Sequence, residues 1–336
     1  MSRGLFASLY EAGRPFALID TRERRDHVDG HWFGSTNIPL SVLTAGITRM
    51  VPDRDFPVHL LDWQDAASNA AAQRLSQLGY ASVTNCPTSH PGGFGEGFVK
   101  GEYVWSKAFG EVLAHRCGLP EVTPSEYLQH HRDALLFDVR PTTEYRRFTI
   151  PGSQSLPNSL LLANMEALKA SGRTALLHCA GRTRSIIGAQ TLINFGVANE
   201  VIALENGTQG WALGDRELEY GAKRFPPNGI MASTLEKAGA RAKSVADRYD
   251  LSFVDHETLA EWQDDATRTL YLIDVRSHDE YLGGHLPGSR HAPGGQLVQA
   301  TDRWIGVRGA RIVVCDDTEV RAVCTAHWLK QMGWEV

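Results

Sequence analysis

The stretch Leu136-Phe137-Asp138-Val139-Arg140 recurs with small changes at two other places in the chain, as Leu18-Ile19-Asp20-Thr21-Arg22 and as Leu272-Ile273-Asp274-Val275-Arg276. Each copy is a short apolar run that ends in an acid, with an arginine two residues further on. Short apolar runs of this kind predict buried strands. A signature that returns at long intervals indicates tandem structural modules.

Two further positions keep a constant distance from the repeated aspartate. An acid stands six residues after it, and a proline stands nineteen residues after it. The acids are Asp26, Glu144 and Glu280, and the prolines are Pro39, Pro157 and Pro293. Equal spacing over this length indicates that the three copies share one local fold.

A second strand and a helix follow in each copy. The strands are predicted at residues 58–61, 174–178 and 311–315. Each helical pattern then ends near a glycine, which is the usual residue just beyond a helix, at Gly79, Gly196 or Gly333. Strands that alternate with helices predict a parallel α/β sheet.

We therefore expect an α/β protein of three tandem modules, at residues 1–100, 115–225 and 250–336, each a mainly parallel sheet flanked by helices. Linkers are expected at residues 100–124 and 225–251, the second with a connecting helix at 233–250. The first two modules continue into another strand and a glycine-rich turn, at residues 91–93 and 205–207, whereas the chain ends soon after the third helix. The third module is therefore expected to be truncated.

Composition places the chain among soluble globular proteins. It has 336 residues, 42% of them hydrophobic, and a formal net charge of −5, which argues against nucleic acid as a partner. No apolar run approaches the roughly 18 residues of a membrane-spanning helix, so no membrane association is expected. Five cysteines without CxxC spacing predict neither a disulfide framework nor a zinc site. We expect a cytoplasmic protein that needs no metal and no cofactor.

The segment with the clearest chemistry runs from His178 to Ser185, between the second strand and the helix of the middle copy. Backbone amides at a helix N-terminus bind anions, and the two arginines of this segment, Arg182 and Arg184, add positive charge. The same field favours the thiolate form of Cys179. One short loop therefore offers both a nucleophile and an anion site.

These residues resemble the rhodanese superfamily of thiosulfate sulfurtransferases. The resemblance rests on Asp138-x-Arg140, Ile150-Pro151-Gly152-Ser153 and Cys179-x4-Arg184-Ser185, and three copies cover nearly the whole chain. It implies that Cys179 takes up a sulfane sulfur as a persulfide and passes it to cyanide or another thiophilic acceptor. It also implies that the loop binds the substrate, through Ala180, Gly181, Arg182, Thr183, Arg184 and Ser185. The expected partners are a small anionic sulfur donor, thiosulfate, a thiophilic acceptor, and a sulfur-carrier or thioredoxin-like protein.

The outer copies depart from this pattern. Seventeen residues before the three helix-ending glycines stand Asp62, Cys179 and Asp316, and twelve residues before them stand Ala67, Arg184 and Arg321. A carboxylate cannot form a persulfide, so we expect the first and third modules to be inactive. The aspartate of the third module is expected to act as a built-in anion in its loop. Cys315 adjoins that position but belongs to the strand.

Two other functions compete with this hypothesis. Cysteine phosphatases and arsenate reductases also use a Cys–Arg loop, but five residues lie between their cysteine and arginine, whereas four do here. A non-catalytic binding scaffold is the second alternative, favoured by the Asp-substituted copies. The repeated Asp–Arg pairs, and also His31, His178 and His285, are expected to be structural rather than catalytic.

Overall fold

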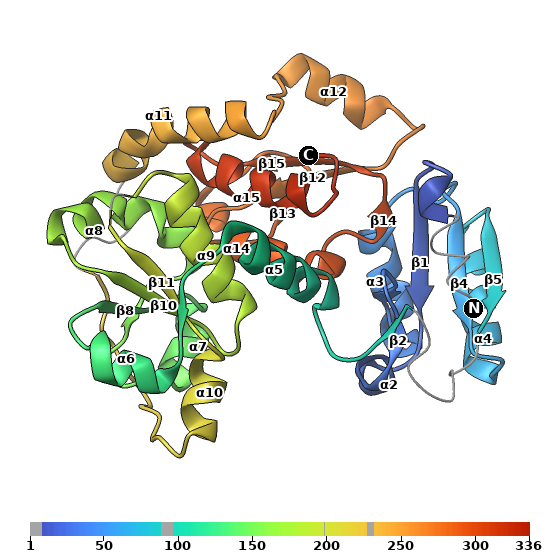
Figure 1. Ribbon diagram of the computed structural model, residues 1–336. Coiled ribbons are helices and arrows are strands. Elements are labelled where there is room, and N and C mark those ends of the chain that lie inside the picture. Colours follow the sequence, from blue (N-terminus) through green and yellow to red (C-terminus); the bar gives the residue numbers. More distant parts are fainter. Residues whose placement is uncertain (1–8, 89–96, 198, 227–231) are drawn as a thin grey trace.

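The computed structural model describes residues 9–88, 97–197, 199–226 and 232–336. These residues form three α/β modules and one long helix between the first two, as Figure 1 shows. Each module is built on a mainly parallel sheet flanked by helices, which confirms the fold class that the repeat predicts.

The first module has a five-stranded sheet, in which β14-β1-β4-β5 lie in that order and β3 pairs with β1. The pairings of β1 with β3 and β4, and of β4 with β5, are parallel. The strands are β1 (Phe16–Asp20), β3 (Thr36–Asn37), β4 (Val58–Asp62) and β5 (Val83–Pro87), with a separate ribbon of β2 (His31–Trp32) and β6 (Phe98–Val99). The helices are α2 (Arg24–Asp29), α3 (Leu43–Met50) and α4 (Ala66–Gln77), with a 3-10 turn at Leu40–Val42.

The second module has the order β7-β11-β10-β8-β9, with every pairing parallel. Its strands are β7 (Glu121–Val122), β8 (Leu135–Asp138), β9 (Gln154–Ser155), β10 (Ala175–His178) and β11 (Val201–Leu204). Its helices are α6 (Pro124–His130), α7 (Thr142–Arg147), α8 (Met165–Ser171), α9 (Thr183–Asn194) and α10 (Gly207–Leu213), with 3-10 turns at Asn158–Leu160 and Leu162–Asn164. The central strand β10 is buried along its whole length, and its carboxyl end leads directly to Cys179.

The third module has a parallel three-stranded sheet in the order β13-β12-β15. Its strands are β12 (Leu270–Asp274), β13 (Arg290–His291) and β15 (Arg311–Cys315). Its helices are α11 (Ala232–Arg248), α12 (His256–Asp264), α13 (His278–Gly283), α14 (Gly294–Gln299) and α15 (Val320–Gln331), with a 3-10 turn at Thr301–Arg303. The helix predicted at residues 233–250 is thus present as α11, and it packs against α15.

The repeated Asp–Arg pair has the same structural role in every module. In the second module, Arg140 donates hydrogen bonds from Nε and Nη2 to the Asp138 carboxylate, at 2.9 and 2.7 Å, and also donates to the carbonyl of Phe148. Both side chains are almost fully buried. In the first module Arg22 donates to the Asp20 carboxylate and to the carbonyl of Gly30. In the third module Arg276 donates to the Asp274 carboxylate and to the carbonyl of Gly284. Each pair therefore ties the end of the first strand to the chain that follows the next helix.

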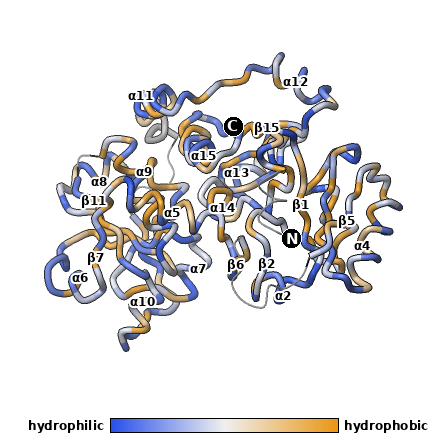
Figure 2. Tube along the Cα trace, turned by 45° about the vertical axis from the view of Figure 1, so that its right-hand side comes forward, coloured by the Kyte–Doolittle hydropathy of each residue, from blue (hydrophilic) through white to orange (hydrophobic). Residues whose placement is uncertain are grey.

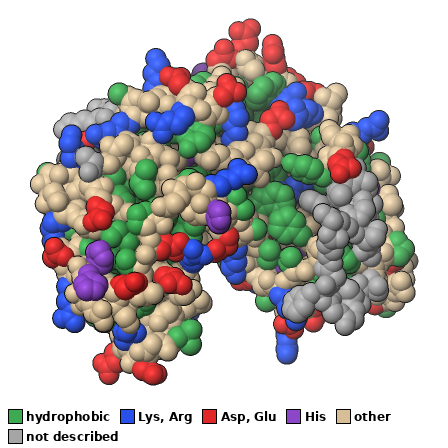
Figure 3. Space-filling model, viewed as in Figure 1, with side chains coloured by type: hydrophobic (Ala, Val, Ile, Leu, Met, Phe, Trp, Pro, Cys, Tyr) green, Lys and Arg blue, Asp and Glu red, His purple; other side chains and the backbone are tan. Residues whose placement is uncertain are grey.

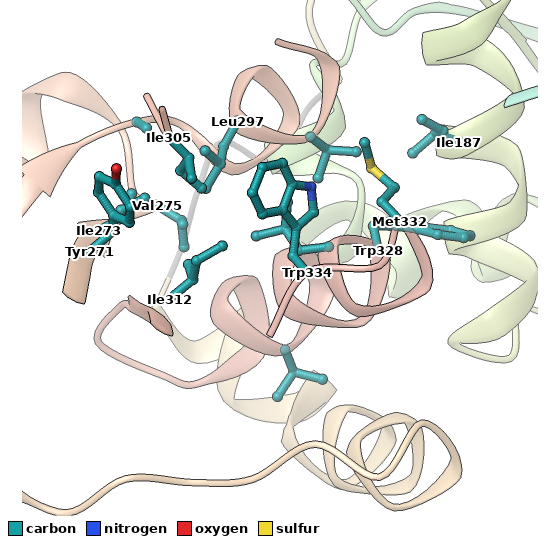
Figure 4. Close-up of a cluster of buried hydrophobic side chains, with 14 of the residues drawn as sticks. Ile187, Tyr271, Ile273, Val275, Leu297, Ile305, Ile312, Trp328, Met332 and Trp334 are labelled. Carbon is teal, nitrogen blue, oxygen red and sulfur yellow. The ribbon is translucent and has the colours of Figure 1, made fainter. Parts of the chain in front are cut away.

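The modules share a hydrophobic core. Strand β14 (Val307–Arg308) follows the third module's 3-10 turn, yet it pairs antiparallel with β1 of the first module. Figure 4 shows Ile187 of α9 opposite Trp328 and Met332, so the second and third modules are also joined by apolar contacts. In Figure 2 the hydrophobic positions follow β1 and the inner parts of the modules. The three sheets are therefore separate, but the packing that stabilises them is continuous.

The segment expected as a linker at residues 100–124 is largely regular structure. It contains α5 (Val104–Cys117) and the edge strand β7. Trp105 donates from Nε1 to the carbonyl of Met332 at 3.1 Å, and Ser106 donates to that of Gln299 at 2.6 Å. The helix is held because its polar side chains satisfy carbonyl groups of the third module, a contact that sequence spacing does not reveal.

Charges are mixed over the visible surface. On the face that Figure 3 shows, Lys and Arg side chains alternate with Asp and Glu side chains. In the described part of the chain, every helix is too short or too polar to cross a membrane.

We expect Tyr271→Phe to destabilise the protein, because the Tyr271 hydroxyl connects the first and third modules. It donates to the carbonyl of Met50 at 2.5 Å and accepts from the backbone N–H of Val307 at 3.1 Å. Leaving these buried groups without a partner should cost about 1–3 kcal/mol. Urea unfolding would measure the loss, with Tyr220→Phe as the control, since Tyr220 is 73% exposed. Equal stabilities of the two variants would contradict this role.

Candidate active site

Cys179 lies at the point where the central strand of the second module ends. It follows β10, and a short loop of residues 180–182 leads from it to the start of α9. The cysteine is 2% exposed, while the loop residues are half-buried. Its Sγ lies 3.7 Å from the Ser185 hydroxyl, which itself donates to the carbonyl of Arg182. The structure therefore places the expected nucleophile at the base of a partly open loop.

The first turn of α10 holds the carbonyl side of this loop. Thr208 N–H donates to the carbonyl of Cys179 and Gln209 N–H donates to that of Ala180, both at 2.9 Å. The C=O and N–H of a trans peptide unit point in opposite directions. The N–H groups of Ala180 and Gly181 therefore point away from α10.

The donor side of the loop has no protein partner. Among the described residues, no backbone or side-chain acceptor receives the N–H groups of residues 180–185. Four of these donors belong to Arg182 and the first turn of α9, where a helix leaves its amides unpaired and carries partial positive charge. A run of free donors that begins next to a thiol is suited to a bound anion or an anionic sulfur.

Gly207 is required for this arrangement. Its φ is +46°, and a Cβ at this position would lie 2.1 Å from the carbonyl oxygen of Cys179. Any larger residue would push α10 away from the loop. Sequence reasoning noted this glycine only as part of a turn, because its contact with the loop is tertiary.

Arg184 lies beneath the loop in a bidentate ion pair. Its two Nη atoms donate to the Glu144 carboxylate at 2.8 and 3.0 Å. Burial opposes its charge, but the hydrogen bonds with Glu144 and the nearby Cys179 raise the pKa of Arg184. Asn158 also donates to the Arg184 carbonyl at 3.1 Å. The guanidinium and the backbone of Arg184 are therefore both fixed by residues outside the loop.

Arg182, which we expected to bind the substrate, is instead engaged by carboxylates outside the loop. It donates from Nε to Glu121 at 2.7 Å and pairs with Glu111 of α5. The hydrogen bond with Glu121 contributes most, and together with that of Glu111 it raises the pKa of Arg182 in spite of partial burial. Its positive charge is compensated by two acids that the loop sequence does not contain, so its side chain anchors the loop in this structure.

Glu144 is the functional neighbour that sequence reasoning missed. It is the acid six residues after Asp138, so its recurrence was a usable signal. The third module repeats the pair, because Arg321 donates to both oxygens of Glu280 at 2.9 Å. In the first module, where Ala67 replaces the arginine, the acid Asp26 has no such partner to bind. The repeated acid and the loop arginine are therefore one structural unit.

His178 is buried behind the loop. Its Nε2 lies 4.0 Å from the Asp138 carboxylate, and burial lowers its pKa. A neutral imidazole beside a buried acid fits the structural role that we expected.

The carboxyl group of Asp316 lies within its own loop, and burial raises its pKa. Its Oδ2 accepts from the backbone N–H of Arg321 at 3.0 Å and from the Thr318 hydroxyl at 3.2 Å. The Arg321 amide is the counterpart of the Arg184 amide, which has no protein acceptor. In the first module Asp62 accepts from the Gln64 N–H, while Asp65 caps α4 through Ser68. Both outer loops thus use carboxylates where the second module has a thiol and free donors.

Three other cysteines, Cys86, Cys315 and Cys324, are poorly suited to be nucleophiles. Burial raises the pKa of Cys315 and that of Cys324 to about 12, and it also raises the pKa of Cys86. Their thiols stay protonated at neutral pH, and thiolate is the reactive form. Within the described residues, no cluster of three or more His, Cys, Asp or Glu side chains could hold a metal ion.

Comparisons with known proteins agree with this architecture. The model of the rhodanese-like domain family matches residues 123–213 and 255–336. A thiosulfate sulfurtransferase from Pseudomonas aeruginosa is similar over 98% of this chain, with 41% sequence identity and a TM-score of 0.91. This chain covers 64% of that protein. A rhodanese with anions from E. coli is 28% identical over 26% of this chain and 99% of its own, with a TM-score of 0.22. No curated protein matches the chain.

We expect Gly207→Ala to destabilise the second module by at least about 2 kcal/mol, since it combines a left-handed backbone with a clash against the loop. Gly239→Ala is the matched control, because a Cβ at Gly239 meets no atom within 4 Å. Thermal unfolding would compare the two variants. An unchanged transition in Gly207→Ala would show that α10 does not hold the loop as described.

Proposed function

The chain belongs to the rhodanese-like domain family, and on that premise we propose that it is a sulfurtransferase that uses Cys179 as its nucleophile. The observation that carries the proposal is the run of free N–H donors from Ala180 to Ser185, directly after the thiol. The similarity to the Pseudomonas aeruginosa enzyme supports the same class of reaction.

In the first half-reaction, the Cys179 thiolate attacks the outer sulfur of thiosulfate. A new S–S bond forms to Cys179, the S–S bond within thiosulfate breaks, and sulfite leaves with its electron pair. The product is a Cys179 persulfide. The terminal sulfur of this persulfide is negatively charged, and the loop amides can donate hydrogen bonds to it. These amides therefore have the role that an oxyanion hole has in acyl transfer.

The second half-reaction returns the enzyme to its starting state. A thiophilic acceptor attacks the terminal sulfur, and the Cys179 thiolate leaves with the electrons of the S–S bond. With cyanide the product is thiocyanate. Small thiols, sulfite, or a sulfur-carrier or thioredoxin-like protein are acceptors with the same chemistry.

Arg184 favours a doubly negative donor in this scheme. Its guanidinium lies beneath the loop, where Glu144 holds it in place. Four residues lie between Cys179 and Arg184, which supports a loop sized for one sulfur atom rather than for a tetrahedral oxyanion.

The outer modules have no part in sulfur transfer in this proposal. Asp316 already fills its loop with a carboxylate, and Asp62 also lacks a sulfur atom. These two modules instead serve in packing and in the recognition of partners.

We expect Cys179→Ser to lower thiocyanate formation from thiosulfate and cyanide by at least about a thousand-fold, because a hydroxyl cannot form the persulfide. Cys117→Ser is the control, since Cys117 is exposed and lies outside the loop. Peptide mass spectrometry after incubation with thiosulfate should find one added sulfur, on Cys179 alone. Retained activity, or a stoichiometric persulfide on Cys315 or Cys86, would refute the assignment.

We expect Arg184→Gln to reduce kcat/KM for thiosulfate by about ten-fold to a hundred-fold, and to affect a neutral sulfur donor such as a dialkyl trisulfide less. Arg321→Gln removes the same kind of ion pair from the third module, which has no nucleophile, and should leave thiosulfate use unchanged. Steady-state kinetics with both donors would decide. Equal losses for the charged and the neutral donor would limit Arg184 to a structural role.

A further inference from the structure

A cavity of about 570 Å³ lies between the first and third modules, far along the chain from the Cys179 loop. One side is formed by α2, β2 and α3, and the other by the start of α5 and by the segment that leads into β14. Figure 1 shows these elements facing one another. Residues of the second module do not line it. Its volume is within the range of small-molecule sites.

Arg308 supplies a buried and uncompensated cation to this cavity. It is 9% exposed, and its guanidinium lies 4.1 Å from the ring centre of Trp105 and 4.2 Å from that of Trp334. The two indoles cover its faces, but among the described residues none accepts a hydrogen bond from its N–H groups or forms an ion pair with it. Burial lowers its pKa to about 10, so it is still charged at neutral pH. A buried guanidinium with free donors is costly unless an anion binds there.

Asp302 supplies a carboxyl group to the same cavity. Burial raises the pKa of this carboxyl, which accepts a hydrogen bond from its own backbone N–H. Arg308 is its strongest electrostatic neighbour, yet no ion pair within 4.0 Å joins the two side chains of this described segment. The cavity therefore holds a guanidinium group and a carboxyl group that no ion pair joins.

Apolar side chains line much of the cavity, and charged side chains line the rest. Val28, Phe33, Ile38 and Val42 line the side of the first module, and Tyr103 lines the other side. At the rim, Glu102 pairs with Arg24 and, at 3.5 Å, with Arg303. Burial lowers the pKa of His31 to about 4, so this histidine adds no charge at neutral pH. Among the charged residues that line the cavity, Arg49 is exposed to solvent, whereas Arg308 is buried and Asp302 is partly buried.

We propose that this cavity binds an α-amino acid with an apolar or aromatic side chain, whose carboxylate pairs with Arg308 and whose ammonium group pairs with Asp302. The two charges of an amino acid lie on one carbon, so one small molecule can reach both groups. Its side chain then contacts the apolar wall of the first module. Such a ligand would also bridge two modules, because Asp302 and Arg308 belong to the third.

Calorimetric titration of the full chain with L-leucine, L-methionine, L-phenylalanine and L-tyrosine tests the proposal. At least one should bind with one-to-one stoichiometry. For that amino acid, the analogue without the ammonium group and the analogue without the carboxylate should each bind at least about ten-fold more weakly. For phenylalanine these are 3-phenylpropanoate and 2-phenylethylamine. Absence of binding by all four, or equal binding of an analogue, would overturn it.

Two variants locate the site. Asp302→Asn should weaken the amino acid at least about ten-fold and leave the carboxylate analogue unchanged, because only the ammonium contact is lost. Val42→Trp should block the cavity, since Val42 is 53% exposed and lines it. Leu213→Trp, at a position 85% exposed in the second module, is the control, and thermal unfolding checks that each variant folds. Unchanged affinity in both Asp302→Asn and Val42→Trp would show that the ligand binds elsewhere.

Discussion

The pairing of a buried aspartate with the arginine two residues later is the interaction on which each module depends. Asp138 and Arg140 are almost fully buried, so their charges must satisfy one another and the nearby carbonyl groups. Because the pair joins the end of β8 to the chain beyond α7, it sets where the neighbouring strand β10 can lie and where it ends. Cys179 follows His178, the strand residue that pairs with Asp138, so the ion pair lies beside the strand end that carries the thiol.

The three modules show how one backbone loop serves different ends. In the second module the amides after Cys179 have no protein acceptor, and α10 holds their carbonyl groups away. In the third module the carboxylate of Asp316 takes the amide that corresponds to Arg184. The residue at one position therefore decides whether the loop amides meet a carboxyl group of the protein or stay free, and we propose that the free amides bind an anion.

Helix α5 links the parts of the molecule. At its start, Trp105 stacks on Arg308 and binds the carbonyl of Met332. Further along, Glu111 pairs with Arg182, and Gly110 packs so closely that a Cβ there would lie 3.1 Å from Thr183. One rigid element thus contacts both the cavity between the outer modules and the loop that carries Cys179.

The sequence alone determined the number of modules, the strand and helix of each copy and the position of Cys179, because these depend on local periodicity and on spacing along the chain. It also indicated the equivalence of Asp62, Cys179 and Asp316. Only the tertiary structure decided what the loop arginines do, since Glu144, Glu121 and Glu111 reach them from other elements. The insertion of β14 beside β1 and the packing of α5 were likewise invisible. Contacts between residues far apart in the chain are chosen by packing of the complete core, and no local pattern records them.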